Sequence, residues 1–408
     1  MTTDDPCAAA IQPYIDGGQL AGAVTLVARD GELLQQAALG FADIAARRPM
    51  ARDSLFRIAS LTKPVTSVAA LTLYDEGRFD LDDPITDWAP EFAHMRVLRS
   101  PDGPLDDTVP AERAITFLDL LTHRSGVTYG DFHAGPIAAA CREALGADID
   151  SVVPPETWIG RLAGLPLIDQ PGAGFHYGAS TDLLGFLIAR MEGRPLAQVL
   201  AARVFGPLGM TDTGFVPTPA QAGRRATIYG FDGEGQMQAR LAHPANGSAF
   251  LAERPDDLTY VSGGAGLWST ADDYLKFARL FVGEGAVDGV RVLKIGTLRR
   301  MTANFLTEAQ IAAAETFGLP VFSGQGFGLG VAVVLDPDKA SATRCKGGVG
   351  TVGWPGAFGC WWQADPTDGK VMVFMAQNAM DSDLMSRGIG LGVFGAIVDF
   401  HRAASALI

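Results

Sequence analysis

The sequence predicts an α+β fold, with a mainly antiparallel sheet covered by helices and a helical subdomain beside it. Two observations carry this prediction. Strand-like segments occur near both ends of the chain, and helix-like segments with Pro- and Gly-rich loops occupy the middle. We expect residues 1–85 and 255–408 to form one sheet-containing unit and residues 86–254 to be a mainly helical insertion.

The chain is predicted to open with a helix and a hairpin. Residues 7–18 can form the helix, and residues 22–40 are typical of two strands around a turn at Asp30–Gly31. Val24 and Leu26 supply apolar side chains to the first of these strands. The hairpin is the expected N-terminal contribution to the sheet.

A further helix is predicted to begin at Ser60. Val65 and Val68 recur at helical spacing, and Gly77 supplies the stop signal. Pro64 limits where the helix can start, because proline has no N–H and is tolerated only in a first turn. Ser60 must therefore lie at the very beginning of this helix.

The remaining elements follow from the same kinds of pattern. Helix-like segments are residues 115–123, 181–193 and 196–209. Late segments that are typical of successive strands are residues 324–336, 350–365 and 369–378, and a last helix covers residues 389–404.

Composition and charge indicate a globular protein whose partners are neither nucleic acids nor membranes. The 408 residues are 48% hydrophobic and 19% charged, which is far from the polar bias of disordered chains. The formal net charge is −14, and an acidic surface repels nucleic-acid phosphates and anionic lipids. No apolar run approaches the ~20 residues that a membrane-spanning helix needs.

The cysteines and the N-terminus favour a cytoplasmic location. Cys7, Cys141, Cys345 and Cys360 form no CxxC pair, and so few cysteines in a long chain are typical of reduced, mostly buried thiols. The first residues carry two aspartates and no early Lys or Arg, so no secretory signal peptide is expected.

Ser60-Leu61-Thr62-Lys63 is the single SxxK tetrapeptide in the chain. Positions i and i+3 lie on one helix face, so Lys63 can hydrogen-bond the Ser60 hydroxyl. A serine becomes a nucleophile when a base accepts its proton, and a lysine can be that base where its surroundings favour the neutral amine. The N–H groups of a helix start also favour the anion of acyl transfer. For these four residues alone, a Ser cap followed by an exposed Lys is the alternative.

The context of this tetrapeptide resembles the active-site segment of the serine β-lactamase and penicillin-binding superfamily. Its nearest form is the family VIII carboxylesterases, with class C β-lactamases as cousins, and the resemblance implies the β-lactamase/transpeptidase-like fold. Similar stretches follow in the same order: ITFLDLLTHRSGV (115–127), GAGFHYGASTDLLGFLIARMEG (172–193), GGAGLWSTADDYLKFARLF (263–281) and KGGVGTVGWPGAFGCWWQADP (346–366).

The resemblance gives Tyr177 the place of the second-motif tyrosine, whose phenol could take the Ser60 proton or protonate the leaving group. Two departures bear on the substrate. Gly178 and Ala179 follow Tyr177, so the Asn amide that helps class C β-lactamases to hold a substrate amide is missing. The third motif is Trp354-Pro355-Gly356, without the usual Lys or His that would hold a β-lactam carboxylate. Both departures favour neutral esters.

The resemblance also implies the groups that bind the substrate. The backbone N–H groups of Ser60 and Ala357 would form an oxyanion hole, and such donors stabilise the developing charge by ~3–4 kcal/mol each. Trp354 and Gly356 would contact the substrate, with Trp354 lining the acyl or alcohol pocket. An ordinary core aromatic is the alternative for Trp354.

The GxGxxG match and the histidines do not indicate a further site. Gly348–Gly353 fits GxGxxG, but no helix is expected after it, so we do not expect a dinucleotide site. The six histidines have no ligand spacing with one another or with the cysteines, so neither a metal nor another cofactor is expected. His176 precedes Tyr177 and is interpreted as structural.

The sequence therefore predicts a serine carboxylesterase that acts on a small-molecule ester through an acyl-enzyme on Ser60. Lys63, Tyr177 or both would handle the proton. The alternatives are a β-lactamase or D-peptidase, an acyltransferase of the same family, and a catalytically inactive binding protein on this fold.

Overall fold

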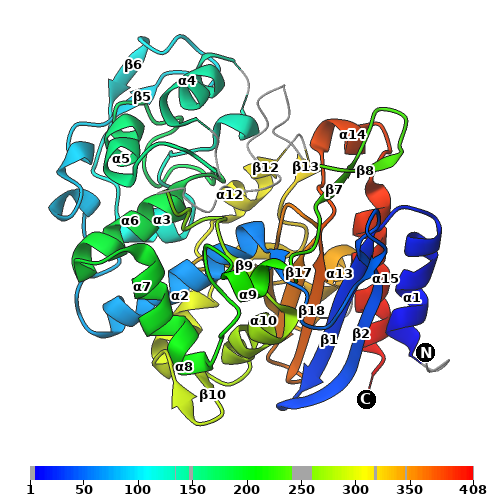
Figure 1. Ribbon diagram of the computed structural model, residues 1–408. Helices are drawn as coiled ribbons and strands as arrows, with labels where there is room; N and C mark the ends of the chain where they lie inside the picture. Colours follow the sequence, from blue (N-terminus) through cyan, green and yellow to red (C-terminus); the bar gives the residue numbers. More distant parts are fainter. Residues whose placement is uncertain are drawn as a thin grey trace.

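A computed structural model describes residues 5–133, 135–146, 150–240, 260–316, 319–344 and 347–407 (Figure 1). His243, Cys345 and the predicted boundary between residues 254 and 255 lie outside these described residues. The division into residues 1–85 with 255–408 and residues 86–254 therefore stays a prediction.

An eight-stranded sheet lies at the centre of the described part of the chain. Its strands run in the order β14-β15-β16-β17-β18-β1-β2-β3, and each pair of neighbours is antiparallel. Both ends of the chain contribute, because β1 pairs with β18. The strands are β1 (Gly22–Arg29), β2 (Glu32–Asp43), β3 (Arg48–Pro49), β14 (Gln325–Phe327), β15 (Ala332–Val334), β16 (Val352–Pro355), β17 (Trp361–Asp365) and β18 (Lys370–Ala376).

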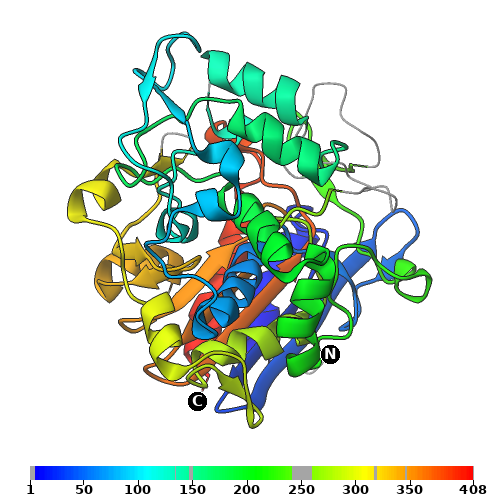
Figure 2. The same ribbon diagram turned by 90° about the vertical axis from the view of Figure 1, so that its left-hand side faces the viewer.

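Each face of the sheet is covered by a pair of helices. Alternate side chains of β1 point to opposite faces. Ala23 packs with α1 (Pro6–Asp16) and α15 (Leu391–Ser405), whereas Val24 belongs to the core shared with α2 (Thr62–Asp75) and α10 (Ala271–Ala278). Figure 2 looks onto the side of α2, with strands from both ends of the chain behind it.

The hairpin predicted around Asp30–Gly31 is observed as β1 and β2, but two late segments each form two strands instead of one. Residues 324–336 turn back through Gly330, whose φ of +90° suits glycine. Residues 350–365 turn between Pro355 and Trp361, so β16 and β17 pair with each other. β16 is consequently the third strand from one edge of the sheet.

The helices between α2 and α10 gather on one side of the sheet, in the cyan and green part of Figure 1. The predicted segment 196–209 forms α7, a π-helical turn and α8, and Gly209 ends it with a φ of +63°. The further helices are α3 (Phe117–Leu121), α4 (Gly135–Leu145), α5 (Pro155–Ala163), α6 (Ser180–Glu192), α7 (Leu196–Leu200), α8 (Gly206–Leu208), α9 (Pro219–Ala222), α11 (Ile295–Met301), α12 (Glu308–Ala313), α13 (Pro337–Arg344) and α14 (Ser382–Ser386).

Short strands and tight helical turns complete the connections. The strands are β4 (Phe56–Arg57), β5 (Arg96–Leu98), β6 (Thr108–Pro110), β7 (Tyr229–Phe231), β8 (Met237–Ala239), β9 (Trp268–Ser269), β10 (Ala286–Val287), β11 (Val290–Arg291), β12 (Glu315–Thr316) and β13 (Leu319–Pro320). The turns are η1 (Ala59–Leu61), η2 (Ile85–Asp87), η3 (Pro90–Phe92), η4 (Gly130–Phe132), η5 (Ala201–Phe205) and η6 (Arg279–Phe281). Among the described helices, none is both long enough and apolar enough to cross a membrane.

The described cysteines are buried thiols, as predicted. Cys7, Cys141 and Cys360 are buried and form no disulfide with one another. Burial raises the pKa of both Cys7 and Cys360 to about 12. Neither of these two thiols is therefore ionised at neutral pH, and neither is a reactive nucleophile.

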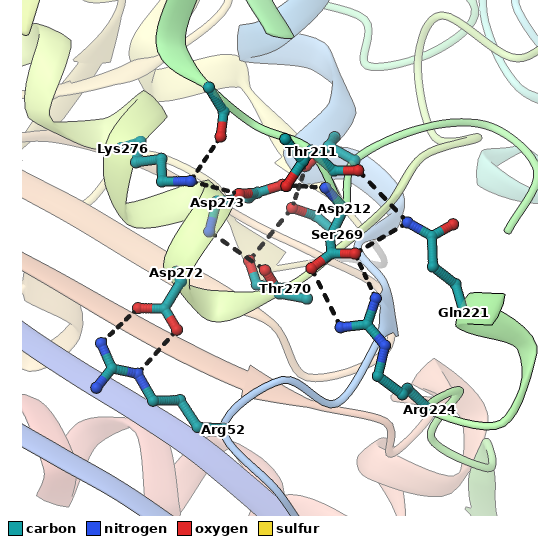
Figure 3. A network of polar contacts seen from close by, with 12 residues as sticks. Arg52, Thr211, Asp212, Gln221, Arg224, Ser269, Thr270, Asp272, Asp273 and Lys276 are labelled. Atoms are coloured by element: carbon teal, nitrogen blue, oxygen red, sulfur yellow. Dashed lines mark hydrogen bonds and ion pairs between the residues drawn. The ribbon is translucent and has the colours of Figure 1, made fainter. Parts of the chain in front are cut away.

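A polar network anchors β9, the short strand that pairs with β4 just before Ser60 (Figure 3). Asp273 on α10 is its centre, because its carboxylate accepts from Asp212 N–H at 2.7 Å, the Thr213 hydroxyl at 3.0 Å and Lys276 at 2.9 Å. The Thr213 hydroxyl also bonds the Ser269 hydroxyl at 2.8 Å. The network thus joins α10, the segment after α8 and β9.

Replacing Asp273 should destabilise the protein. We expect Asp273→Ala to lower the free energy of unfolding by about 1–3 kcal/mol, because the donors around this buried carboxylate lose their acceptor. Arg52→Ala is the matched control: it breaks an ion pair with Asp272 in the same region, but both side chains are well exposed. The control should cost less than about 1 kcal/mol. Urea unfolding followed by circular dichroism measures both, and equal costs would contradict the anchoring role of Asp273.

Candidate active site

Ser60 lies where β4 passes into α2. The 3₁₀ turn η1 contains Ser60, and α2 begins at Thr62, which matches the start that Pro64 predicts. The backbone before it is held by β4 and β9 and by the hydrogen bond from Ile58 N–H to the Leu267 carbonyl at 3.0 Å. The side chain of Ser60 is thereby placed at a fixed helix start.

Ala59, directly before Ser60, has a left-handed backbone with a φ of +45°. A residue with a Cβ pays of order 1–3 kcal/mol for such a conformation, which persists where the surroundings impose it. Here Ala59 is fully buried, and the Tyr274 hydroxyl donates to the Leu61 carbonyl at 2.9 Å on the other side of Ser60. The turn that carries Ser60 is therefore strained and rigidly held.

Arg57 links the segments on either side of this turn. Its guanidinium donates to both oxygens of Asp150, at 2.7 and 2.9 Å, and both side chains are buried. The same guanidinium lies 5.9 Å from the centre of the Trp268 ring and 5.5 Å from that of Phe358. Arg57 therefore connects β9 with the turn after β16, which are the two neighbours of the Ser60 segment.

Lys63 lies one helical turn from Ser60, as the SxxK motif predicts, and its side chain is buried. Its Nζ is 3.3 Å from Ser60 Oγ, 3.3 Å from the Tyr129 hydroxyl oxygen and 2.9 Å from the Gly264 carbonyl oxygen. Three partners fill the hydrogen-bonding positions of an amine nitrogen. The amine is therefore held against the serine hydroxyl.

The tyrosine that hydrogen-bonds Lys63 is Tyr129, which the sequence analysis did not identify. The Tyr129 hydroxyl donates to Asp182 Oδ2 at 2.7 Å. Burial, the Asp182 charge and the other neighbouring groups raise the pKa of Tyr129 well above its ordinary value, so its phenol stays protonated. Asp182 Oδ1 also accepts from Ser262 at 2.5 Å, from Tyr260 at 3.1 Å and from Gly264 N–H at 3.1 Å.

Two glycines allow the backbone to approach this network. A Cβ on Gly264 would lie 2.5 Å from Asp182 Oδ2 and 2.6 Å from the Tyr129 hydroxyl. A Cβ on Gly178 would lie 2.4 Å from the Cα of Thr128, beside Tyr129. The glycine after Tyr177 is thus required by packing, whereas the missing Asn amide concerns the next position, Ala179.

Tyr177 contacts the same Lys63 amine through the face of its ring and not through its hydroxyl. Lys63 Nζ lies 4.5 Å from the centre of the Tyr177 ring. The Tyr177 hydroxyl accepts from Trp354 Nε1–H at 3.1 Å, and no other described residue hydrogen-bonds it. Trp354 is mostly buried and packs on both Tyr177 and Phe327. The contacts of Trp354 therefore hold the Tyr177 side chain in place.

The His123 ring also packs against the Tyr177 ring, and the two ring centres are 4.9 Å apart. Burial and the Lys63 charge hold the pKa of His123 well below its ordinary value, so the ring is neutral. Its Nδ1 accepts from Gly178 N–H at 3.4 Å, which leaves Nε2–H to face the Thr181 hydroxyl at 3.5 Å. The neighbouring His176 bonds Asp169 at 2.9 Å, a contact that suits the structural role expected of it.

The two predicted oxyanion donors have no hydrogen-bond acceptor among the described residues. The N–H groups of Ser60 and Ala357 donate to no described residue, and both residues are partly exposed. Gly356 N–H, in contrast, donates to the Cys360 carbonyl at 2.8 Å. A Cβ on Gly356 would lie 2.6 Å from the Ile58 carbonyl oxygen. Gly356 therefore brings the turn that carries Ala357 close to the Ser60 segment.

The other candidate motifs form no site in the described part of the chain. The GxGxxG segment leads into β16, with no helix after it. Among the described residues, no group of three His, Cys, Asp or Glu side chains is placed to hold a metal ion.

Comparison with known proteins identifies relatives over nearly the whole chain. The Beta-lactamase family model matches residues 7–387. Protein Rv1367c of Mycobacterium tuberculosis is 45% identical over 91% of this chain and 90% of that protein. Esterase EstB of Burkholderia gladioli is 36% identical over 89% of this chain and 87% of that protein. The structure of EstCE1, "a hydrolase with promiscuous acyltransferase activity", covers 97% of both chains with a TM-score of 0.78 and 27% identity.

The chain belongs to the β-lactamase family, among the serine β-lactamase-like esterases that its motifs predict. The expected β-lactamase/transpeptidase-like fold, with an antiparallel sheet flanked by helices, is confirmed by the same comparisons.

The close approach of Gly264 gives a test of the network. We expect Gly264→Ala to lower the free energy of unfolding by about 1–3 kcal/mol, because the new Cβ overlaps Asp182 and Tyr129. The ester-cleaving rate should fall with it, since the same atoms hold Lys63. Gly160→Ala on α5 is the control, because a Cβ there meets nothing within 4 Å. Equal stability of the two variants in urea unfolding would contradict the geometry.

Proposed function

We propose that this protein is a serine hydrolase that cleaves small neutral carboxylic esters through an acyl-enzyme on Ser60. The observation that carries the proposal is the 3.3 Å contact between the buried Lys63 amine and the hydroxyl of Ser60 at a helix start. The similarity to esterase EstB and to the hydrolase EstCE1 supports the ester-cleaving class.

Lys63 is the base that the geometry favours. Ser60 Oγ attacks the ester carbonyl carbon while its proton passes to Lys63 Nζ, so that a C–O bond forms and the carbonyl oxygen becomes an oxyanion. The N–H groups of Ser60 and Ala357 would bind that oxyanion, since neither donates to a described residue. The bond to the alcohol oxygen then breaks and leaves an acyl-Ser60 ester.

Tyr177 is suited to give the proton to the departing alcohol. Its hydroxyl oxygen accepts from Trp354, so its own proton is not committed to a described acceptor. Lys63 contacts the face of the Tyr177 ring and not its hydroxyl, so a water would relay the Ser60 proton from Lys63 to the Tyr177 oxygen. Water then attacks the acyl-Ser60 carbonyl by the reverse proton path and releases the acid.

The charges around Ser60 support a neutral substrate. Asp182 already accepts four hydrogen bonds, and Lys63 has its own partners. Trp354 fills the motif position where a β-lactam-binding cation would stand and contacts Tyr177. A substrate carboxylate would therefore find no counter-charge from these residues.

Transfer of the acyl group to an alcohol is the second candidate activity. It is favoured by the likeness to EstCE1, a hydrolase with promiscuous acyltransferase activity. An added alcohol would replace water in the second step, and chromatography of the products would show a new ester. A cytoplasmic location stays a prediction; the buried thiols of Cys7, Cys141 and Cys360 support it.

Loss of the nucleophile or of the base should abolish ester cleavage. We expect Ser60→Ala and Lys63→Met each to lower kcat for p-nitrophenyl butyrate by at least about 10³-fold, and the double variant to be no slower than Ser60→Ala. A fluorophosphonate probe should label Ser60 in the wild type. Nitrocefin, measured beside the ester, should be cleaved far more slowly. Ester turnover that survives in Ser60→Ala would exclude Ser60 as the nucleophile, and faster nitrocefin cleavage would favour a β-lactamase.

The hydrogen bond from Trp354 to Tyr177 should contribute to the rate. Trp354→Phe keeps an aromatic ring but removes the N–H, and we expect kcat to fall about 10-fold, the usual worth of one such bond. Trp361→Phe is the control, because Trp361 is equally buried but packs with α1 and α15 on the opposite face of the sheet. If both variants hydrolyse the ester at equal rates, the bond to Tyr177 has no catalytic role.

A further inference from the structure

We infer that Asp182 is a positioning residue that fixes the direction of the hydrogen bonds around Lys63, so that the lone pair of the neutral amine faces Ser60 Oγ. The inference rests on the proposed ester cleavage and adds a residue that the motifs do not identify. Asp182 acts on Lys63 through two separate paths, one through Tyr129 and one through Gly264.

The first path fixes the role of Tyr129. A phenol has one proton, and Tyr129 donates it to Asp182 Oδ2 at 2.7 Å. Toward Lys63, 3.3 Å away, the Tyr129 oxygen can therefore act only as an acceptor. The raised pKa of Tyr129, which comes first from burial and then from the Asp182 charge, keeps that proton in place at neutral pH.

The second path fixes the Gly264 peptide. Gly264 N–H donates to Asp182 Oδ1 at 3.1 Å, while the carbonyl of the same residue accepts from Lys63 at 2.9 Å. The Thr66 hydroxyl holds the preceding carbonyl, that of Gly263, at 2.7 Å. Because a carbonyl oxygen can only accept, the second partner of Lys63 is also fixed in direction.

The hydrogen count at Lys63 then decides what faces Ser60. A neutral amine has two N–H groups and one lone pair. The two N–H groups are required by Tyr129 and Gly264, so the lone pair is left for the third partner, Ser60 Oγ. When the Ser60 proton moves to the amine, no other hydrogen bond has to change. Such a preorganised acceptor is what general base catalysis needs.

Asp182 also sets the charge near the amine. The titratable groups around Lys63 are Tyr129, Tyr177 and His123, with Asp182 and Tyr260 one step further. The pKa shifts of Tyr129 and His123 keep both neutral, so Asp182 is the carboxylate among these groups. Asp182→Asn keeps the size of the side chain but replaces one acceptor oxygen by an NH2 donor, so the hydrogen bonds that direct Tyr129 and Gly264 toward Lys63 cannot both be kept.

The test is kcat and KM for p-nitrophenyl butyrate hydrolysis by Asp182→Asn, Tyr129→Phe and Tyr260→Phe, each measured per mole of folded enzyme. We expect kcat to fall about 10²-fold in Asp182→Asn and Tyr129→Phe, with KM changed by less than about threefold. A residue that served stability alone would lower the amount of folded protein without lowering kcat per folded molecule.

Tyr260→Phe is the matched control, because Tyr260 is a buried tyrosine that donates to the same carboxylate but does not touch Lys63. It should keep kcat within a few-fold of the wild type. If Asp182→Asn does not fold, the comparison of Tyr129→Phe with Tyr260→Phe decides. Equal losses in these two, or an unchanged kcat in a folded Asp182→Asn, overturn the inference. A wild type without Ser60-dependent turnover or fluorophosphonate labelling overturns the proposed function itself, which is a separate result.

Discussion

Lys63 is an amine taken out of water, with an exposed fraction of 1%, and a buried amine needs partners for its N–H groups. The Gly264 carbonyl and the Tyr129 hydroxyl meet that need, and both are held by Asp182 on α6. These hydrogen bonds thereby fix α2, α6 and the segments before η4 and β9 relative to one another. Removing any one of these partners would leave a buried polar group unsatisfied, which is costly.

Small residues are what bring these elements so close. Gly263 lies against α6, where its Cβ would come 2.9 Å from the Thr181 carbonyl and 3.3 Å from the Cα of Gly185. Gly264 passes between Asp182 and Tyr129 in the same way. Side chains at these positions would push α6 away from α2 and stretch the bonds to Lys63. The chemistry of the polar groups thus depends on the absence of side chains beside them.

The parts of the site that sequence could predict are those encoded locally. Ser60 and Lys63 are three residues apart on a helix whose start Pro64 fixes, and Tyr177 lies in a stretch that resembles a known motif. Tyr129 and Lys63 are 66 positions apart in the sequence, and helical or strand periodicity cannot predict a contact between residues so far apart. The one local signal was Asp182, a carboxylate in the first turn of a helix that continues with the apolar run 183–189, where a charged residue is costly to bury without a partner. The late hairpins were missed because glycine turns interrupt what looks like continuous apolar strand.

Two tyrosines flank Lys63, and their different partners give them different chemistry. Tyr129 has committed its proton to a carboxylate and its oxygen to the amine, so it is a fixed acceptor. Tyr177 receives a hydrogen bond from Trp354 and offers Lys63 the face of its ring, so its proton stays free to move. Residue type alone therefore does not set what each phenol can donate or accept; its hydrogen-bond partners do.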